Sequence, residues 1–578
     1  MDIAILDLGG QYVFNIRRCL LEQGFNAAIL PFNTPAEKLR DVKGIILSGG
    51  PYSVYDENAP MIDEKILRLG KPILGICYGH QLLAKFLGGI VKRGVGEYGF
   101  SEINILDKNN VLFRGWNNRE ICWMSHSDNI VKLPKNIEVL ASTDKCRYAS
   151  FHLDDIYGVQ FHPEVSHTPK GYMILRNFAA DVCGIEKTKW NVESFIKKSM
   201  DDIRRNIGDG RAIIAVSGGV DSTTLAVLAH KILGNRLICI HIDTGLMRKN
   251  ESKMVVEMLG KLGLNVIHIE SREEFLRELD DVVDSDRRRK IIGKIFIKKF
   301  EEIADKYNVK WLLQGTIAPD VIESSRGSAE RRRGIRHGGL IKVHHNVAGL
   351  PNDMKLNVLE PFKELFKYQV RILAKRLGLP REIIERQPFP GPGLGCRIVG
   401  KITLDKLELL RDITDIVEKS FSEVKSSQYF TYLVNGIEKS FKSSILNRKL
   451  KVYKAFYLKG KFIGIKGDER IIGRAIGIFS KKFRDMKYIE LLKLQSEITG
   501  KYRDICRVIV LLKIFENYSK EIGIVIRAVD TMDFMTAIPS KIDFTMLEKI
   551  SIDIERIVKP IFIGYEITTK PAATIEPI

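Results

Sequence analysis

A cysteine between two glycines is the first residue of this chain that could do chemistry. In Gly75-Ile76-Cys77-Tyr78-Gly79 it follows an apolar run and precedes a helical pattern, which predicts the sharp strand-to-helix turn of a nucleophile elbow. Glycines on both sides permit such a turn. The N–H groups and the positive dipole at a helix start favour a thiolate. Cys77 is therefore the candidate nucleophile.

A thiolate nucleophile needs a base, and Phe161-His162-Pro163-Glu164 supplies a histidine beside a carboxylate. Residues i and i+2 of an extended strand share a face, so Glu164 can hold the His162 ring while that ring faces Cys77. This is the nucleophile, base and orienter arrangement. His126 competes for the role of base, but no Pro-Glu follows it, so we expect it to be structural or to lie near the substrate. Taken singly, a buried cysteine is more often packing and a His-x-Glu more often surface.

A second stretch could bind phosphate. Ser217-Gly218-Gly219-Val220-Asp221-Ser222 follows the apolar run 212–216 and opens a helical pattern. Its glycines let backbone N–H groups approach a phosphate at the positive end of the helix. The chain lacks the spaced Gly, Gly-Lys and Ser or Thr of a Walker A loop. The alternative interpretation is an ordinary helix start capped by Ser or Asp.

Two sets of strands and helices must position these residues. Apolar runs at 3–6, 44–47 and 72–76 are separated by turn signals, which predicts buried parallel strands. Together with the helical pattern at 78–87 they predict an α/β domain. Strand 212–216 and the helical pattern that follows it begin a second α/β domain.

Changes in pattern predict the domain boundaries. The polar stretch 186–206 reads as a linker with an entry helix, which places a boundary near residue 190. From about residue 400 a long polar helical region precedes strand 522–529 and helix 541–557, and this predicts an α+β domain. We expect domains at 1–190, 191–400 and 401–578, the last with an insertion near 472–520.

Composition narrows the class of protein. A chain of 578 residues is too long for one core, so two to four domains are expected. The eight cysteines include no C-x-x-C pair, which indicates reduced thiols and no structural metal. The N-terminus lacks the pattern of a secretory signal and no apolar run approaches about 20 residues, so we expect a soluble, cytoplasmic protein with no membrane partner.

The net charge of +20 would attract polyanions. Basic clusters at 287–290, 331–333 and 439–454 could contact nucleic acid. Solvated basic surface and clefts for anionic nucleotides explain the same charge, so nucleic-acid binding is not predicted.

The cysteine and histidine segments resemble the class I glutamine amidotransferase family. The resemblance extends to Gln81, to Ser48-Gly49-Gly50-Pro51 and to Met124-Ser125-His126-Ser127-Asp128. It implies a flavodoxin-like domain in which Cys77, His162 and Glu164 hydrolyse glutamine to glutamate and ammonia. It also implies that the N–H groups of Gly50 and Tyr78 stabilise the oxyanion and that Gln81 helps to bind glutamine.

The glycine-rich stretch resembles the SGGxDS loop of the ATP pyrophosphatase family, whose fold is of the adenine-nucleotide α-hydrolase type. The resemblance implies that ATP binds at Ser217, Gly218, Gly219, Val220, Asp221, Ser222 and Gly315 and is split to AMP and pyrophosphate. Asp221 is then the candidate ligand for Mg²⁺, because that ion prefers oxygen donors beside phosphates.

Segments along the rest of the chain resemble GMP synthetases, and they are 241–248, 289–293, 314–324, 341–347, 388–395, 530–536 and 570–576. The resemblance implies that ATP adenylates xanthosine monophosphate (XMP), that ammonia displaces AMP, and that the C-terminal domain contacts XMP and forms a homodimer. It implies XMP contacts from Arg248, Lys570, Ile575 and Glu576, and a lid that carries Lys342, His344 and His345.

The chain departs from the family at the C-terminus. Phe562 stands where the family has an arginine, and Pro577-Ile578 replaces a terminal Trp-Glu. Two other functions share part of the pattern. A tRNA-modifying ATP pyrophosphatase would have the same loop, but the fused glutaminase argues against it. A non-catalytic nucleic-acid-binding or scaffold protein would not need Cys77, His162, Glu164 and Asp221.

Overall fold

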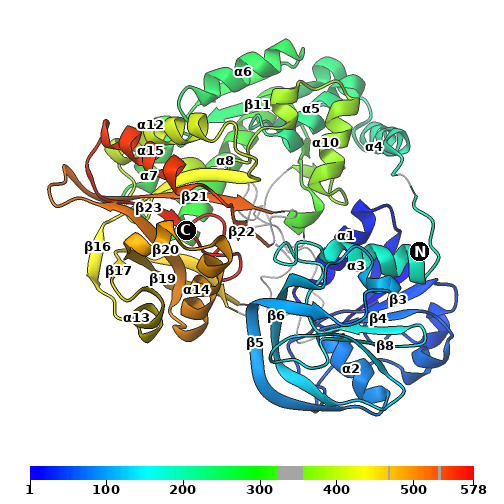
Figure 1. The fold of residues 1–578 in the computed structure, drawn as a ribbon. Coiled ribbons are helices and arrows are strands. Elements are labelled where there is room, and N and C mark those ends of the chain that lie inside the picture. The colour runs from blue at the N-terminus through cyan, green and yellow to red at the C-terminus, as the bar shows by residue number, and fades with distance from the viewer. Residues whose placement is uncertain (189, 322–355, 467–468, 532–535) are drawn as a thin grey trace. The chain divides into compact units, whose positions relative to one another are not determined.

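The computed structural model describes every residue except 189, 322–355, 467–468 and 532–535. Contacts divide the chain into two compact units. The first contains residues 1–190 with 489–501 and 536–538, and the second contains the remaining residues. Figure 1 labels their helices and strands. None of the helices within the described ranges is both long and apolar enough to cross a membrane.

The first unit is built on a nine-stranded sheet in the order β2-β1-β3-β4-β9-β8-β7-β5-β6. The pairs from β2 to β9 are parallel and the pairs from β9 to β6 are antiparallel. The strands are β1 (Ile3–Asp7), β2 (Ala27–Pro31), β3 (Gly44–Leu47), β4 (Ile73–Ile76), β5 (Ile90–Ile105), β6 (Arg119–Lys132), β7 (Glu138–Ser142), β8 (Ser150–Leu153) and β9 (Ile156–Val159).

Alternation along β1 sends side chains into cores on both faces of this sheet. Ile3 and Ile5 join one core with helices α1 (Val13–Glu22) and α3 (Gly171–Asn177). Ala4 and Leu6 join the other with helix α2 (Tyr78–Phe86). A sheet covered on both faces explains why its parallel strands read as continuous apolar runs.

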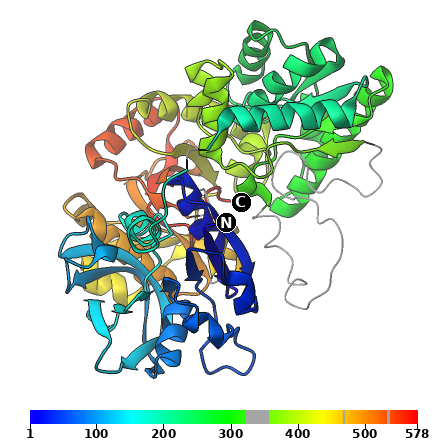
Figure 2. The ribbon, with the colours of Figure 1, turned by 90° about the vertical axis from the view of Figure 1, so that its right-hand side faces the viewer.

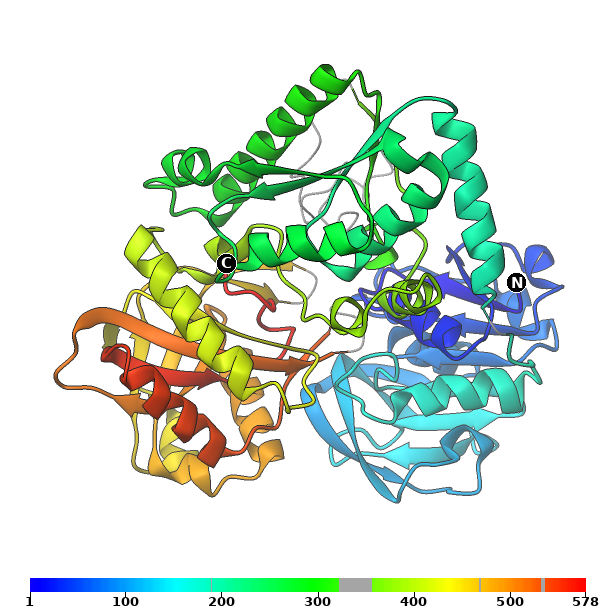
Figure 3. The same ribbon diagram turned by 90° about the horizontal axis from the view of Figure 1, so that it is seen from above.

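The second unit begins with a five-stranded parallel sheet in the order β12-β11-β10-β13-β14. Chain order reverses beside β10, so the loop after β10 lies at a topological switch point, where α/β sheets bind ligands. Helices lie on both sides of the sheet (Figures 2 and 3). The strands are β10 (Ala212–Ala215), β11 (Leu237–Asp243), β12 (Val266–Glu270), β13 (Trp311–Leu313) and β14 (Asn357–Leu359). The helices are α4 (Val192–Ile207), α5 (Val220–Leu233), α6 (Glu251–Lys261), α7 (Arg272–Leu279), α8 (Ser285–Tyr307), α10 (Lys367–Arg376) and α11 (Arg381–Ile384).

Residues 401–578 carry a third, mostly antiparallel sheet, in the order β15-β21-β23-β20-β19-β17-β16, with β18 on β19 and β22 on β21. The strands are β15 (Gln428–Val434), β16 (Ile437–Ser440), β17 (Lys454–Leu458), β18 (Phe462–Lys466), β19 (Glu469–Phe479), β20 (Ile505–Ile514), β21 (Lys520–Asp530), β22 (Ile538–Pro539) and β23 (Pro560–Glu566). The helices are α12 (Leu404–Ser420), α13 (Ser444–Leu450), α14 (Tyr488–Lys501) and α15 (Phe544–Glu555). Strands β19 and β20 are interior strands, so the segment 472–520 supplies part of the sheet itself.

Candidate active sites

The nucleophile elbow is present at Cys77. This residue lies between β4 and α2 with φ 53° and ψ −103°, a backbone conformation that residues other than glycine rarely adopt. A Cβ on Gly75 would lie 2.6 Å from the Gly79 carbonyl, and a Cβ on Gly79 would lie 2.6 Å from the Leu47 carbonyl. Both glycines are therefore required by close backbone approach, and the strain is concentrated at the candidate nucleophile.

The predicted base and orienter meet in the structure, but in the turns that follow β9 (Ile156–Val159) and not on an extended strand. His162 Nδ1 lies 2.8 Å from Glu164 Oε1, and both residues are buried. Burial opposes a charged ring, but Glu164 and Cys77 outweigh it and raise the pKa of His162 above its ordinary value. A Cβ on Gly49 would meet the His162 ring at 3.1 Å and Cys77 Cβ at 3.6 Å. Cys77, His162 and Glu164 thus form one buried cluster.

The predicted oxyanion residues lie beside this cluster. Tyr78 is the first residue of α2, where its N–H has no partner within the helix. A Cβ on Gly50 would lie 3.4 Å from the Tyr78 ring, so the two residues are neighbours. Gln81 is buried and donates from Nε2 to Asp128 O at 2.8 Å and to Gln160 Oε1 at 3.1 Å. Its amide nitrogen is therefore engaged with the protein.

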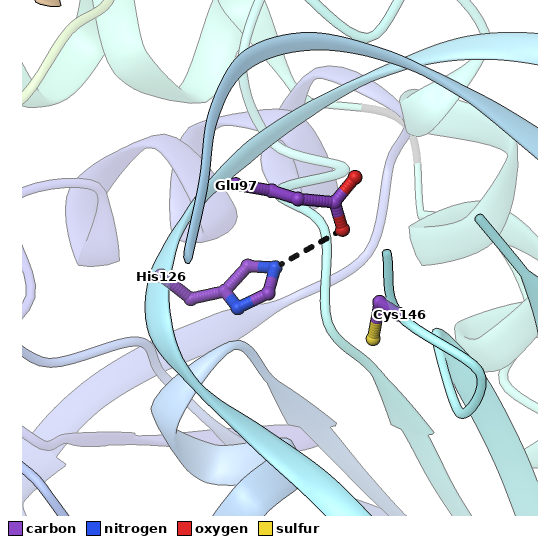
Figure 4. A group of neighbouring side chains, drawn as sticks. All are labelled: Glu97, His126 and Cys146. Atoms are coloured by element: carbon purple, nitrogen blue, oxygen red, sulfur yellow. Dashed lines mark ion pairs between the residues drawn. The ribbon is translucent and has the colours of Figure 1, made fainter. Parts of the chain in front are cut away.

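His126 is not beside Glu164 but in a second buried group. Its Nε2 faces Glu97 Oε2 at 3.5 Å, and Cys146 lies close to both side chains (Figure 4). Glu97 and His126 are directly opposite each other on antiparallel strands β5 and β6, where facing side chains interact. The structural role expected for His126 fits this position.

The glycine-rich loop joins β10 to α5. Gly218 has φ +75°, and a Cβ there would lie 2.5 Å from Val255 and 2.5 Å from Arg386. Asp221 Oδ2 pairs with Lys367 Nζ at 2.6 Å, while its buried Oδ1 has no hydrogen-bond partner among the residues that the structure describes. Gly315 packs against Ser222, with a built Cβ 3.2 Å from Ser222 N. The structure thus brings the predicted ATP residues together.

A third cluster contains two of the predicted XMP residues. Arg248 pairs with Glu418 at 3.0 Å and lies over the Phe389 ring, 4.5 Å from its centroid. Arg397 lies over the same ring at 5.3 Å and binds both carboxylate oxygens of Glu576 at 3.1 Å. Phe389 and Arg397 together therefore link Arg248 with Glu576.

The chain end that carries Glu576 is anchored in the third sheet. Arg507 and Arg527 are fully buried and both pair with the buried carboxylate of Glu566. Arg507 also donates to Thr574 O at 3.0 Å and to Glu576 O. Lys570 and Ile575 are buried in the same terminal segment.

Comparison with known proteins decides the family. The family described as glutamine amidotransferase class-I matches residues 4–182, asparagine synthase matches 202–316, and GMP synthase C terminal domain matches 516–577. A glutamine-hydrolysing GMP synthase of Caldicellulosiruptor saccharolyticus is 40% identical over an alignment of 583 positions, which covers 99% of each chain. The chain belongs to the glutamine-hydrolysing GMP synthase family.

Two further relatives in the family are similar along their whole length. The GMP synthase of Caldanaerobacter subterraneus subsp. tengcongensis is 40% identical over 99% of this chain and 98% of its own. That of Clostridium tetani is 38% identical over 99% of both chains. The likeness confirms the expected family and the expected fold classes.

The structure adds residues to the candidate sites that the sequence patterns did not predict. Gln160 donates to Cys77 Sγ, Lys367 pairs with Asp221, and Arg397 holds Glu576. No local sequence pattern points to Gln160, Lys367 or Arg397, because each is far from its partner in the chain.

Two expectations remain, namely the departure from the family at Phe562 and the predicted lid. The structure places Phe562 in β23, fully buried, with its ring 2.1 Å from a Cβ built on Gly523. The side chain at this position therefore fills the glycine gap in β21. The predicted lid residues Lys342, His344 and His345 lie outside the described residues.

Proposed function

We propose that this chain makes GMP from XMP. ATP adenylates the O2 atom of XMP and releases diphosphate, and ammonia from glutamine then displaces AMP. The products are GMP, AMP, diphosphate and glutamate. Family membership supports this proposal, and the buried contact of His162 with Glu164 beside the strained Cys77 is the observation that carries the glutamine half.

In the glutaminase site, Cys77 Sγ attacks the side-chain carboxamide carbon of glutamine. His162 takes the thiol proton and passes it to the departing ammonia, while Glu164 holds Nδ1 of the ring. The N–H groups of Gly50 and Tyr78 bind the oxyanion. Water then attacks the thioester, His162 takes a proton from that water and delivers it to the sulfur as the C–S bond breaks, and glutamate leaves. Gln81 helps to form the glutamine pocket.

In the ATP site, the loop from Ser217 to Ser222 binds the diphosphate part of ATP through its N–H groups and the start of α5, and Gly315 allows ATP close to the loop. Mg²⁺ fits this site, because the buried Asp221 Oδ1 is an oxygen donor without a hydrogen-bond partner in the described part of the chain. When bound, Mg²⁺ would neutralise charge on the leaving diphosphate. Lys367 orients the other oxygen of Asp221.

The XMP pocket is proposed at the cluster around Phe389. Arg248 and Lys570 supply positive charge for the phosphate, Glu576 accepts from ribose hydroxyls, and Ile575 covers the nucleotide. Arg397 fixes the direction of the Glu576 carboxylate. Lys342, His344 and His345 would close over ATP and XMP.

The proposal extends to assembly and location. We propose a homodimer formed through residues 401–578, to be tested by light scattering of the purified chain. A reducing, cytoplasmic location is supported by the eight cysteines, all of which are free thiols in the structure.

One assay tests the proposed reaction. The purified chain is incubated with ATP, Mg²⁺, glutamine and XMP, and nucleotides are separated by chromatography. We expect GMP and AMP in equal amounts. AMP that forms only when tRNA is added, without GMP, would overturn the proposal.

A further inference from the structure

Behind Cys77 lies a chain of buried amides that the catalytic triad does not include. Gln160 is fully buried, and its Nε2 lies 3.7 Å from Cys77 Sγ. On the other side, the Cys77 thiol faces the Ser125 carbonyl at 3.6 Å. The carbonyl can accept only from the protonated sulfur, whereas the amide N–H can bind the thiolate. The two contacts therefore favour opposite protonation states of the nucleophile.

The orientation of the Gln160 amide follows from a backbone carbonyl. Asp128 O can only accept, so the Gln81 group 2.8 Å from it must be the NH₂ group. The second hydrogen of that NH₂ group points to Gln160, 3.1 Å away, which must present its oxygen. The nitrogen of Gln160 is thereby turned toward Cys77 Sγ.

The Asp128 carbonyl is itself held by the second histidine. His126 Nδ1 lies 3.0 Å from Asp128 O, so Nδ1 carries the proton. The other ring nitrogen faces Glu97, whose carboxylate also accepts from Ser101 Oγ at 3.1 Å and from Thr143 Oγ1 at 2.9 Å. Figure 4 shows the Glu97–His126 contact as a dashed line.

We propose that Gln160 is a hydrogen-bond donor to the Cys77 thiolate, and that Gln81, His126 and Glu97 are positioning residues that aim this donor. The inference rests on the proposed glutaminase role of Cys77. It gives the site two His–carboxylate pairs with separate tasks. His162 with Glu164 moves the proton, and His126 with Glu97 orients the group that stabilises the sulfur after the proton has left.

A metal ion is the competing assignment for the second pair. Glu97, His126 and Cys146 offer ligand atoms within 4.8 Å of one another. The described residues supply these three donors and no fourth, whereas a structural zinc site is closed by four. Both oxygens of Glu97 are already hydrogen-bonded, Oε1 by Ser101 Oγ and Oε2 by Thr143 Oγ1. We therefore assign the trio to hydrogen bonding.

The test uses the full-length chain with Gln160→Met and Gln160→Glu, which remove the donor and preserve the length of the side chain. Gln23→Met is the matched control, because Gln23 Nε2 makes the same kind of contact with Cys19 Sγ at 3.5 Å. The rate of Cys77 alkylation by iodoacetamide is followed by peptide mass spectrometry between about pH 5 and 9. Cys77 influences the pKa of His162 and of Cys146, and neither residue is changed in these variants.

We expect both Gln160 variants to move the acid limb of the alkylation profile to higher pH by about one unit, which is about a tenfold loss of rate at neutral pH. Glutamine-dependent GMP synthesis should fall by about the same factor and recover at alkaline pH, while ammonia-dependent synthesis and Gln23→Met stay at the wild-type level. Ammonia-dependent synthesis also reports that each variant is folded. An unmoved profile in whichever Gln160 variant folds would overturn the proposal.

The positioning residues are tested separately. His126→Leu should move the profile in the same direction, and His126→Asn, whose amide can still donate to Asp128 O, should restore it. One zinc per chain in the wild type, with the same shift on zinc removal, would overturn the assignment to hydrogen bonding. If Cys77→Ala still uses glutamine, the proposed function fails; if only the Gln160 variants behave as wild type, this inference alone fails.

Discussion

At the scale of residues, the candidate sites contain carboxylates that pair with a nitrogen of another side chain. Glu164 holds His162, Glu97 faces His126, and Asp221 pairs with Lys367. In each pair one carboxylate oxygen lies beside a side-chain nitrogen, and the other oxygen can interact with a different group. For Glu164 and Asp221 that second oxygen is buried without a hydrogen-bond partner among the described residues.

The Glu97 pair predicts a pH-dependent stability. Burial opposes ionisation of Glu97, but hydrogen bonds from His126 and Thr143 outweigh it and lower the pKa below 4.5. A lowered folded pKa means that the contribution is complete above 4.5 and is lost as the pH falls through the folded pKa. Glu97→Gln should therefore cost about 1 kcal/mol at pH 7 and nothing below the folded pKa.

The measurement is urea unfolding at pH 7 and at lower pH, followed by Trp fluorescence. Glu138→Gln is the control, because Glu138 forms a similar pair with His152 at 2.8 Å but its side chain is 71% exposed. An equal loss in Glu97→Gln at all pH values would contradict the argument.

Asp221 predicts a loss of synthesis with either nitrogen source. Asp221→Asn keeps the shape but removes the charge that attracts Mg²⁺ and Lys367. We expect GMP synthesis from glutamine or from ammonia to fall about 100-fold or more, as for removal of a group that acts on the transition state. Hydrolysis of glutamine, assayed alone, tests whether the substitution affects only the ATP site. A variant that loses only glutamine-dependent synthesis would refute the assignment of Asp221 to the ATP site.

At the scale of elements, both candidate sites lie where a parallel strand ends and a helix begins. Cys77 stands between β4 and α2, and Gly218 between β10 and α5. Each junction contains glycines that neighbouring atoms approach more closely than a side chain permits. The turn is therefore as much part of the site as the reactive group.

Two glycines with the same φ angle allow the effect of backbone strain to be measured apart from the effect of close contacts. Gly218 and Gly263 both have φ +75°, but a Cβ on Gly218 would meet Val255 and Arg386, whereas a Cβ on Gly263 would have no atom within 4 Å. Alanine at Gly263 should cost about 1 kcal/mol of stability, and alanine at Gly218 should cost more because its Cβ also meets Val255 and Arg386. Only Gly218→Ala should also raise the KM for ATP, by about tenfold or more, because the loop must shift.

Steady-state kinetics in ATP together with thermal unfolding checks this pair. Equal kinetic effects at Gly218 and Gly263 would show that the loop geometry is not what binds ATP.

At the scale of the whole molecule, one chain carries a glutaminase site and an ATP site, so each should be removable without the other. Cys77→Ala should abolish GMP synthesis from glutamine and leave synthesis from added ammonium at about the wild-type rate, because ammonia bypasses the first site. GMP formation measured with each nitrogen source checks this. Loss of both activities in a folded variant would mean that the two-site description is wrong.

The sequence by itself determined the chemistry that is local in the chain. Cys77 with its glycines, His162 with Glu164, and the loop from 217 to 222 are short segments, because a strand-to-helix turn and the turn after β9 each act over a few residues. The departure at Phe562 was visible, but not that the ring fills the space above Gly523.

Only the tertiary structure decided the contacts between distant segments. Gln160 reaches Cys77 across 83 positions, Lys367 reaches Asp221 across 146, and Arg397 reaches Glu576 across 179. Such pairs are set by strand order and register, which no local pattern specifies. The cysteine was evident from its neighbours in the chain, and the amide that faces its sulfur became evident only when β4 and β9 were seen side by side.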